Sequence, residues 1–142
     1  MNDEMVRGKV QNAIETLIER DAYLLELDAH EVSVSHKLAE YLQQEFPEWN
    51  VDCEFNKYYG KTKTLEEYEK DRVRPDIIVH RRGTDEDLLV IEIKLTTSND
   101  DICSEKEKVE LYTEDEDLDY QHGLFLHLKA GDEAGVEDTE WY

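Results

Sequence analysis

The sequence is poor in basic residues, and this imbalance limits the partners it can have. Its 142 residues include 16 lysines and arginines against 37 aspartates and glutamates, for a formal net charge of −21. Such a surface repels polyphosphate at long range, which argues against loose binding of nucleic acid but leaves room for a local basic strip. Solubility is the simplest interpretation of the charge. Adaptation to high salt and an acidic imitation of DNA are the alternatives.

Cysteines and long apolar runs are also scarce. Two cysteines are too few for a disulfide scaffold, and no Cys/His cluster has the spacing of zinc ligands. Cys53 shares a predicted strand face with Val51 and Phe55, so we expect a small core residue there. The longest apolar stretches, such as residues 88–91, cannot span a bilayer. The first four residues lack the basic start of a secretory signal. We therefore expect a cytoplasmic protein without membrane attachment.

The length and the 39% of hydrophobic residues predict one domain over residues 1–142. Apolar residues recur at helical spacing over 4–20, and again over 31–46, where Pro47 ends the pattern. A stretch containing a turn separates these two helices. A capping box at Thr64–Glu67 predicts the start of a further short helix, and residues 101–113 predict another.

Strands are predicted at residues 51–56, 75–81, 87–95 and 122–128. Residues 82–86 suit a hairpin connection between the second and third strands. The last dozen residues are acidic and weakly patterned, with Trp141 as an anchor. This order of elements predicts an α/β fold with a mixed four-stranded sheet flanked by helices.

The strand at 87–95 has an unusual second face. One face is wholly apolar, while the other reads Leu88, Val90, Glu92 and Lys94. Because that second face begins with two large apolar residues, we expect Glu92 and Lys94 at the end of a strand that is covered on both sides. Charges in such a place are costly unless they are paired or bound to a ligand.

The hairpin register predicts a partner for Glu92. A turn centred on Thr84 sets His80 opposite Leu88, Ile78 opposite Val90, and Asp76 opposite Glu92. Directly opposed residues share a face, with Cβ atoms about 5 Å apart. Two carboxylates at that separation repel each other unless a proton or a cation lies between them. We expect His80, far along the strand from Asp76, to be structural.

Two carboxylates and an ammonium on one face suit a divalent ion such as Mg²⁺ and a phosphate that it activates. The alternative is purely structural. In that interpretation Asp76 only begins a strand after Pro75, and Lys94 only neutralises Glu92.

Pro75-Asp76, followed by Glu92-Ile93-Lys94, resembles the motif of the PD-(D/E)XK nuclease superfamily, whose members are restriction-endonuclease-like. The resemblance covers residues 31–128 and implies an αβββαβ core, with the first helix as an addition. It implies a Mg²⁺-dependent phosphodiesterase of endonuclease type, acting on DNA rather than RNA. Asp76 and Glu92 would hold one or two Mg²⁺ ions, or Mn²⁺ in their place, with the Ile93 carbonyl as an extra ligand. Lys94 would orient or deprotonate the attacking water.

The same resemblance implies a glutamate from the helix before the first core strand, which would help to bind a metal or to order its water. Glu31 is our choice, because it lies on a helical stripe with Ser35 and Leu38 and forms its polar end. The structural alternative is an acidic residue favoured by the helix dipole in the first turn. Glu40 and Glu54 are the next candidates.

Basic residues near Asp76 are candidates for binding the phosphate backbone. Arg72 and Arg74 lie beside Asp76, and Lys57, Lys61 and Lys63 extend this strip. Arg81 and Arg82 are better explained as solvated turn charges. Because the strip is small, we expect a homodimer or a partner protein to complete the binding surface.

Three other functions remain open. A catalytically silent binding or assembly module explains the small basic strip, but not the intact Asp76, Glu92 and Lys94. An acidic inhibitor that imitates DNA explains the charge, but not that constellation. The third is another metal-dependent hydrolase on the same scaffold.

Overall fold

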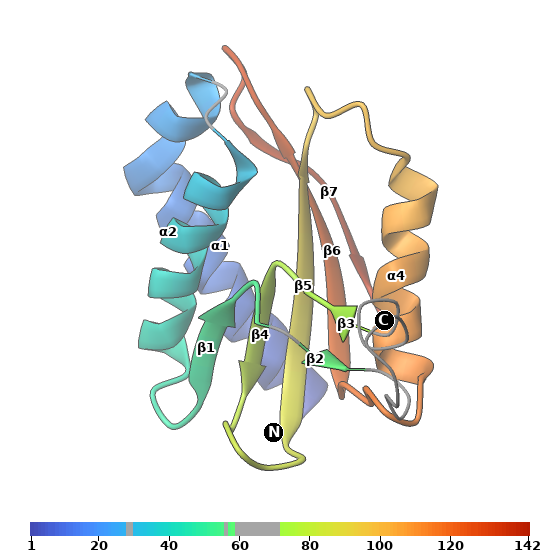
Figure 1. Ribbon diagram of the computed structural model, residues 1–142. Coiled ribbons are helices and arrows are strands. Elements are labelled where there is room, and N and C mark those ends of the chain that lie inside the picture. The colour runs from blue at the N-terminus through green and yellow to red at the C-terminus, as the bar shows by residue number, and fades with distance from the viewer. Residues whose placement is uncertain (28–29, 56, 59–71) are drawn as a thin grey trace.

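The computed structural model describes residues 1–27, 30–55, 57–58 and 72–142 and has three layers (Figure 1). Two helices, α1 (Asp3–Glu26) and α2 (Glu31–Glu45), cover one face of a sheet, and α4 (Ile102–Glu114) covers the other. The sheet has the order β1-β4-β5-β6-β7. Its strands are β1 (Asn50–Cys53), β4 (Ile77–His80), β5 (Asp87–Leu95), β6 (His122–Lys129) and β7 (Gly135–Trp141). A separate two-stranded ribbon pairs β2 (Lys57–Tyr58) with β3 (Arg72–Val73).

The predicted α/β fold with a mixed sheet is confirmed. Strands β5 and β6 are parallel and are connected through α4, whereas the other neighbours in the sheet are antiparallel. None of the helices in the described part of the chain is both long and apolar enough to cross a bilayer.

The prediction of four strands is wrong, because the acidic C-terminal stretch forms β7 at the edge of the sheet. Most β7 side chains are exposed, so the strand lacks the apolar alternation that marks a half-buried strand. Trp141 is partly buried against the core, as expected of an anchor, and the Arg7 guanidinium lies 5.1 Å from its ring centroid.

The first helix is longer than predicted. The backbone departs from helical geometry at Asp21 (φ −123°, ψ 22°), next to the predicted end, but the helix then continues to Glu26. Tyr41 of α2 donates a hydrogen bond to the Asp21 carboxylate, which ties the kink to the second helix. Buried Leu25 explains why the chain remains helical beyond the kink.

Two other predictions about the sheet are corrected. The first strand ends at Cys53, before a left-handed residue, Glu54 (φ 48°). Cys53 is exposed rather than part of the core, because β1 is an edge strand. The predicted helix beginning at residues 64–67 lies outside the described residues.

The core divides into a large cluster beneath α1 and α2 and a small one beneath α4. Ile78 and Val90 belong to the small cluster, together with Tyr112 of α4. Gly123 of β6 lets α4 approach closely, since a Cβ there would lie 2.7 Å from a methyl group of Val109. This close packing positions the inner face of α4 over the end of β5 that carries Glu92.

Candidate active site

The hairpin brings Asp76 and Glu92 into one cavity. Ile77 pairs with Ile91 and Ile78 pairs with Val90, as predicted. Asp76 directly precedes β4, and its Oδ2 accepts a hydrogen bond from the Ile93 amide at 2.7 Å. The cavity has a volume of about 340 Å³. Its lining residues are Arg74, Asp76, Glu92, Lys94, Glu105, Lys108, Leu111 and Tyr112.

The predicted pairing of His80 with Leu88 is wrong. A β-bulge after Val79 pairs His80 with Asp87 instead, which leaves Leu88 as the extra residue. Leu88 therefore packs in the large core beneath α1 and α2, not beside Val90. His80 is buried, with Nε2 2.6 Å from Asp52 Oδ2 and Nδ1 3.9 Å from Asp87 Oδ1. These contacts support the structural role expected for it.

Asp76 and Glu92 form an acidic pair, with Glu92 buried and Asp76 partly buried. Burial raises the pKa of Glu92 well above its usual range, and the Asp76 charge and a hydrogen bond to Asp76 raise it further. Burial also raises the pKa of Asp76, although the Ile93 amide and the hydrogen bond from Glu92 act against that shift. The pair therefore holds a proton more strongly than ordinary carboxyl groups do. The Tyr112 hydroxyl donates a hydrogen bond to Glu92 Oε1 at 3.3 Å.

Lys94 is held by two carboxylates. Its Nζ lies 2.7 Å from Asp100 Oδ2 and 3.4 Å from Glu31 Oε2, and its side chain is 13% exposed. Partial burial acts to lower the pKa of Lys94, but the hydrogen bond to Asp100 and the charges of Glu31 and Glu105 outweigh it. The net shift is upward, so Lys94 is a cation at neutral pH. This geometry suits an electrostatic role better than a role as a base.

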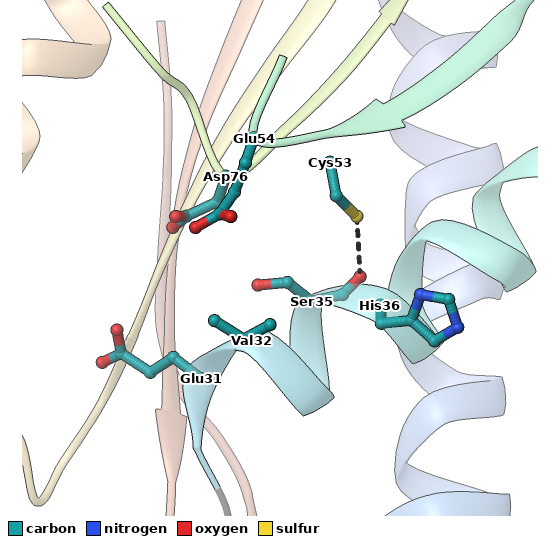
Figure 2. Close-up of a pocket in the computed structure, with 7 residues that line it drawn as sticks. All are labelled: Glu31, Val32, Ser35, His36, Cys53, Glu54 and Asp76. Carbon is teal, nitrogen blue, oxygen red and sulfur yellow. Dashed lines mark hydrogen bonds between the residues drawn. The ribbon is translucent and has the colours of Figure 1, made fainter. Parts of the chain in front are cut away.

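Glu31 connects α2 to the end of β5. Its Oε1 accepts a hydrogen bond from the Leu95 amide at 3.2 Å, while Oε2 meets Lys94. It lines a second cavity, of about 180 Å³, together with Asp76 and Glu54 (Figure 2). Glu40, the next candidate for this role, instead pairs with His36 and Lys37 at the surface.

Three polar residues of α4 at the cavity were not identified from the sequence. Glu105, Lys108 and Tyr112 all line it. Glu105 is buried, and its Oε1 lies 3.0 Å from Lys108 Nζ. The available signal was their helical spacing together with Val109, which marks the inner face of α4. A glutamate on such a face should be paired or functional.

The side chains of the cavity offer a hard divalent ion only part of the donors that it needs. Within the residues described, no three Asp, Glu, His or Cys side chains are arranged to hold a metal. Asp76 and Glu92 nevertheless provide two oxygen donors, and Mg²⁺ is often bound by one or two carboxylates with water completing its shell. The residues fit such an ion when it takes the place of the shared proton. The Ile93 carbonyl remains a predicted ligand.

Of the predicted phosphate-binding residues, Arg74 is exposed and lines the cavity. Arg72 and Lys57 lie on the paired strands β3 and β2, and their side chains are outside the described part of the chain, as are Lys61 and Lys63. Arg81 pairs with Glu86 at 2.9 Å, and Arg82 pairs with Asp52. The side chain of Arg82 is exposed and that of Arg81 is partly exposed, in keeping with the solvated turn charges expected there.

Comparison with known proteins gives little guidance. No protein-family model matches the chain, and no curated protein matches it. A similar solved structure is described as "Crystal structure of SSO0001". The alignment covers 98% of this chain and 60% of that one, with 15% identity and a TM-score of 0.43. A similarity this weak carries no information about function.

Proposed function

We propose that the protein is a Mg²⁺-dependent phosphodiesterase of the PD-(D/E)XK type that hydrolyses nucleic acid, with DNA favoured over RNA. The observation that carries the proposal is the Asp76–Glu92 pair, removed in large part from solvent, in a cavity that also holds Lys94. Two such carboxyl groups in contact destabilise a fold whenever both ionise. Their placement in the lining of a cavity is explained when they serve a ligand that carries positive charge.

The finer assignment of the fold belongs to this proposal. From α2 onward, the sheet and its two covering layers follow the order α2, β1, β4, β5, α4, β6. This order supports the αβββαβ core of restriction-endonuclease-like proteins. The helix α1 and the edge strand β7 would then be additions to that core.

The residues of the cavity would divide the chemistry between them. Asp76 and Glu92 would hold Mg²⁺, or Mn²⁺ in its place, with the Ile93 carbonyl as a third donor. A bound ion of this kind neutralises phosphate charge and lowers the pKa of a water molecule that it binds. Lys94, as a cation, would orient the phosphate and stabilise the negative charge that develops on it. Glu31 would fix Lys94 in place through its contacts with Nζ and with the Leu95 amide.

Nucleic acid would be bound by the cations around the cavity. Arg74 and Lys108 both line it. Arg72, Lys57 and Lys61 would extend the strip. Because a net charge of −21 opposes polyphosphate, a second copy of the chain or a partner protein would add to this grip.

A catalytically silent binding module is the second candidate. The contact of 2.7 Å between Lys94 and Asp100 favours it, because the lysine is then already neutralised by a surface carboxylate. The same contact is also compatible with catalysis. Asp100 is 57% exposed and lies in the segment after β5, so a substrate phosphate could take its place beside Lys94.

A cleavage assay separates the two candidates. Labelled single- and double-stranded DNA are incubated with Mg²⁺ or Mn²⁺ and either the wild type or Asp76→Asn. We expect metal-dependent cleavage by the wild type and at least a hundredfold loss in Asp76→Asn, about the size of effect seen on removing a key electrostatic group. Asp85→Asn, in the exposed hairpin turn, is the matched control. DNA binding without cleavage under every condition would favour the silent module.

A further inference from the structure

Asp76 lies between two cavities that differ in charge. On the α4 side, the cavity of about 340 Å³ is lined by three cations, Arg74, Lys94 and Lys108, which face the carboxyl groups of Asp76, Glu92 and Glu105. On the α2 side, the cavity of about 180 Å³ is lined by Glu31 and Glu54 (Figure 2). Asp76 lines both. A nucleic-acid strand that crossed the site would therefore meet the three cations on one side of Asp76 and the two glutamates on the other.

The three cations come from different parts of the fold. Arg74 precedes β4, Lys94 lies on β5, and Lys108 lies on α4. The side chain of Lys108 is 53% exposed, and its Nζ contacts Glu105 at 3.0 Å. A long, flexible ammonium in this position can turn toward a phosphate that enters the cavity. Cations from three parts of the fold can contact the phosphate oxygens of one strand and so position it.

The two carboxylates on the α2 side are positioned in different ways. Glu31 accepts a hydrogen bond from the Leu95 amide, and its Oε2 lies 3.4 Å from Lys94 Nζ. Glu54 adopts a left-handed conformation and donates its amide to the Asp76 carbonyl at 3.0 Å, and its carboxyl group faces the cavity in Figure 2. The one basic side chain among the described residues that line this cavity is His36, whose Nε2 lies 3.2 Å from Glu40.

The volumes of the two cavities also favour the α4 side as the place of the substrate. Cavities that enclose a small organic ligand usually measure about 300–1,000 Å³. The cavity on the α4 side reaches this range, whereas the cavity on the α2 side does not. The cavity next to α4 therefore offers more room for a nucleotide than the cavity between α2 and β1.

We propose that the substrate strand occupies only the α4 side of Asp76, so that the strand ends at the site and nucleotides are removed from a free end. This inference rests on the proposed function and replaces the internal cut implied by the resemblance. The chemistry is hydrolysis in either case. Water forms a bond to phosphorus, one P–O ester bond breaks, and the leaving oxygen takes up a proton.

The test compares a fluorescent single-stranded oligonucleotide with the same oligonucleotide ligated into a closed circle. Affinity for the full-length protein is measured by anisotropy with Ca²⁺, and cleavage is then measured with Mn²⁺. We expect the linear strand to bind at least about tenfold more tightly, because the circle forces phosphates against carboxylates. We also expect cleavage of the linear strand alone.

The two readouts separate this inference from the proposed function. Equal affinity for the two strands, or equal cleavage of them, would overturn the inference, and cleavage of either strand would leave the proposed nuclease in place. Preference for the linear strand without cleavage would support the placement of the strand and overturn the proposed function.

Charge reversal on the acidic side gives a second test. We expect Glu54→Lys to raise affinity for the circle at least about tenfold and to change affinity for the linear strand by no more than about twofold. Glu48→Lys is the matched control, since it makes the same charge change at an exposed residue that lines neither cavity. A gain in Glu54→Lys no larger than that in Glu48→Lys would overturn the inference.

Discussion

The carboxylate of Asp76 is hydrogen-bonded to the amide of Ile93, with Oδ2 2.7 Å from the nitrogen. Ile93 lies between Glu92 and Lys94, so this bond fixes Asp76 against the backbone of the two other residues of the motif. The side chains of Glu92 and Lys94 project to the same face, while that of Ile93 is buried in the large core on the opposite face. The acidic side chains of the cavity are therefore positioned by the backbone of β5, the central strand of the sheet.

Replacing Lys94 tests whether this residue acts through its charge or as a base. Since neighbouring carboxylates raise the pKa of Lys94, we expect Lys94→Ala to lose turnover and Lys94→Arg to retain a measurable part of it. Mn²⁺ affinity should survive in both variants, because the acidic pair remains. Single-turnover cleavage of a labelled strand measures the first effect, and calorimetry measures the second. Near wild-type cleavage by Lys94→Ala would show that the lysine is purely structural.

Tyr112→Phe removes the hydroxyl that contacts Glu92 Oε1. One hydrogen bond is lost from a buried side chain, so we expect the free energy of unfolding to fall by about 0.5–1.5 kcal/mol. Urea unfolding of the metal-free protein measures this change. Tyr23→Phe, at an exposed tyrosine of α1, is the control and should leave stability nearly unchanged. An equal change in both variants would mean that the contact with Glu92 contributes nothing.

The acidic pair should make the metal-free protein sensitive to rising pH. A carboxyl group whose pKa is raised on folding binds more protons in the native state than in the unfolded state. Its stabilising contribution is complete below the unfolded pKa and is lost as pH rises through the folded pKa. Asp52 and Asp100 have lowered pKa values and act in the opposite direction, so the effect must be isolated by difference.

Glu92→Gln provides that difference, because the amide cannot ionise. We expect the variant to gain stability relative to the wild type as pH rises from mildly acidic to alkaline values, with EDTA present. Urea unfolding at a series of pH values measures the difference between the two proteins. A difference that is independent of pH would contradict the raised pKa of Glu92.

The sequence was most informative where one face of an element is buried. Strand β5 and the pairing of Ile78 with Val90 follow from alternation and from the length of the hairpin turn. The bulge at His80 could not be anticipated, since it depends on buried contacts with Asp52 and Asp87 from neighbouring strands. Strand β7 escaped notice because an exposed edge strand needs few apolar residues.

The candidate site likewise has a part that could be predicted from the sequence and a part that could not. Asp76, Glu92 and Lys94 lie on one hairpin, so their proximity is a local property of the sequence. The contacts of Lys94 with Glu31 and Asp100, and the position of Glu105 and Tyr112, depend on how α2 and α4 pack on the sheet. Such packing between distant segments is not encoded in any single stretch of residues.

The most direct measurement is calorimetric titration of Mn²⁺ into the metal-free wild type, Asp76→Ala and Asp85→Ala. Asp85 is an exposed residue of the hairpin turn, so its replacement removes the same charge from the same hairpin without touching the cavity. We expect the wild type and Asp85→Ala to bind Mn²⁺ with equal affinity, and Asp76→Ala to lose that binding. Equal binding by all three proteins would contradict a metal site at Asp76.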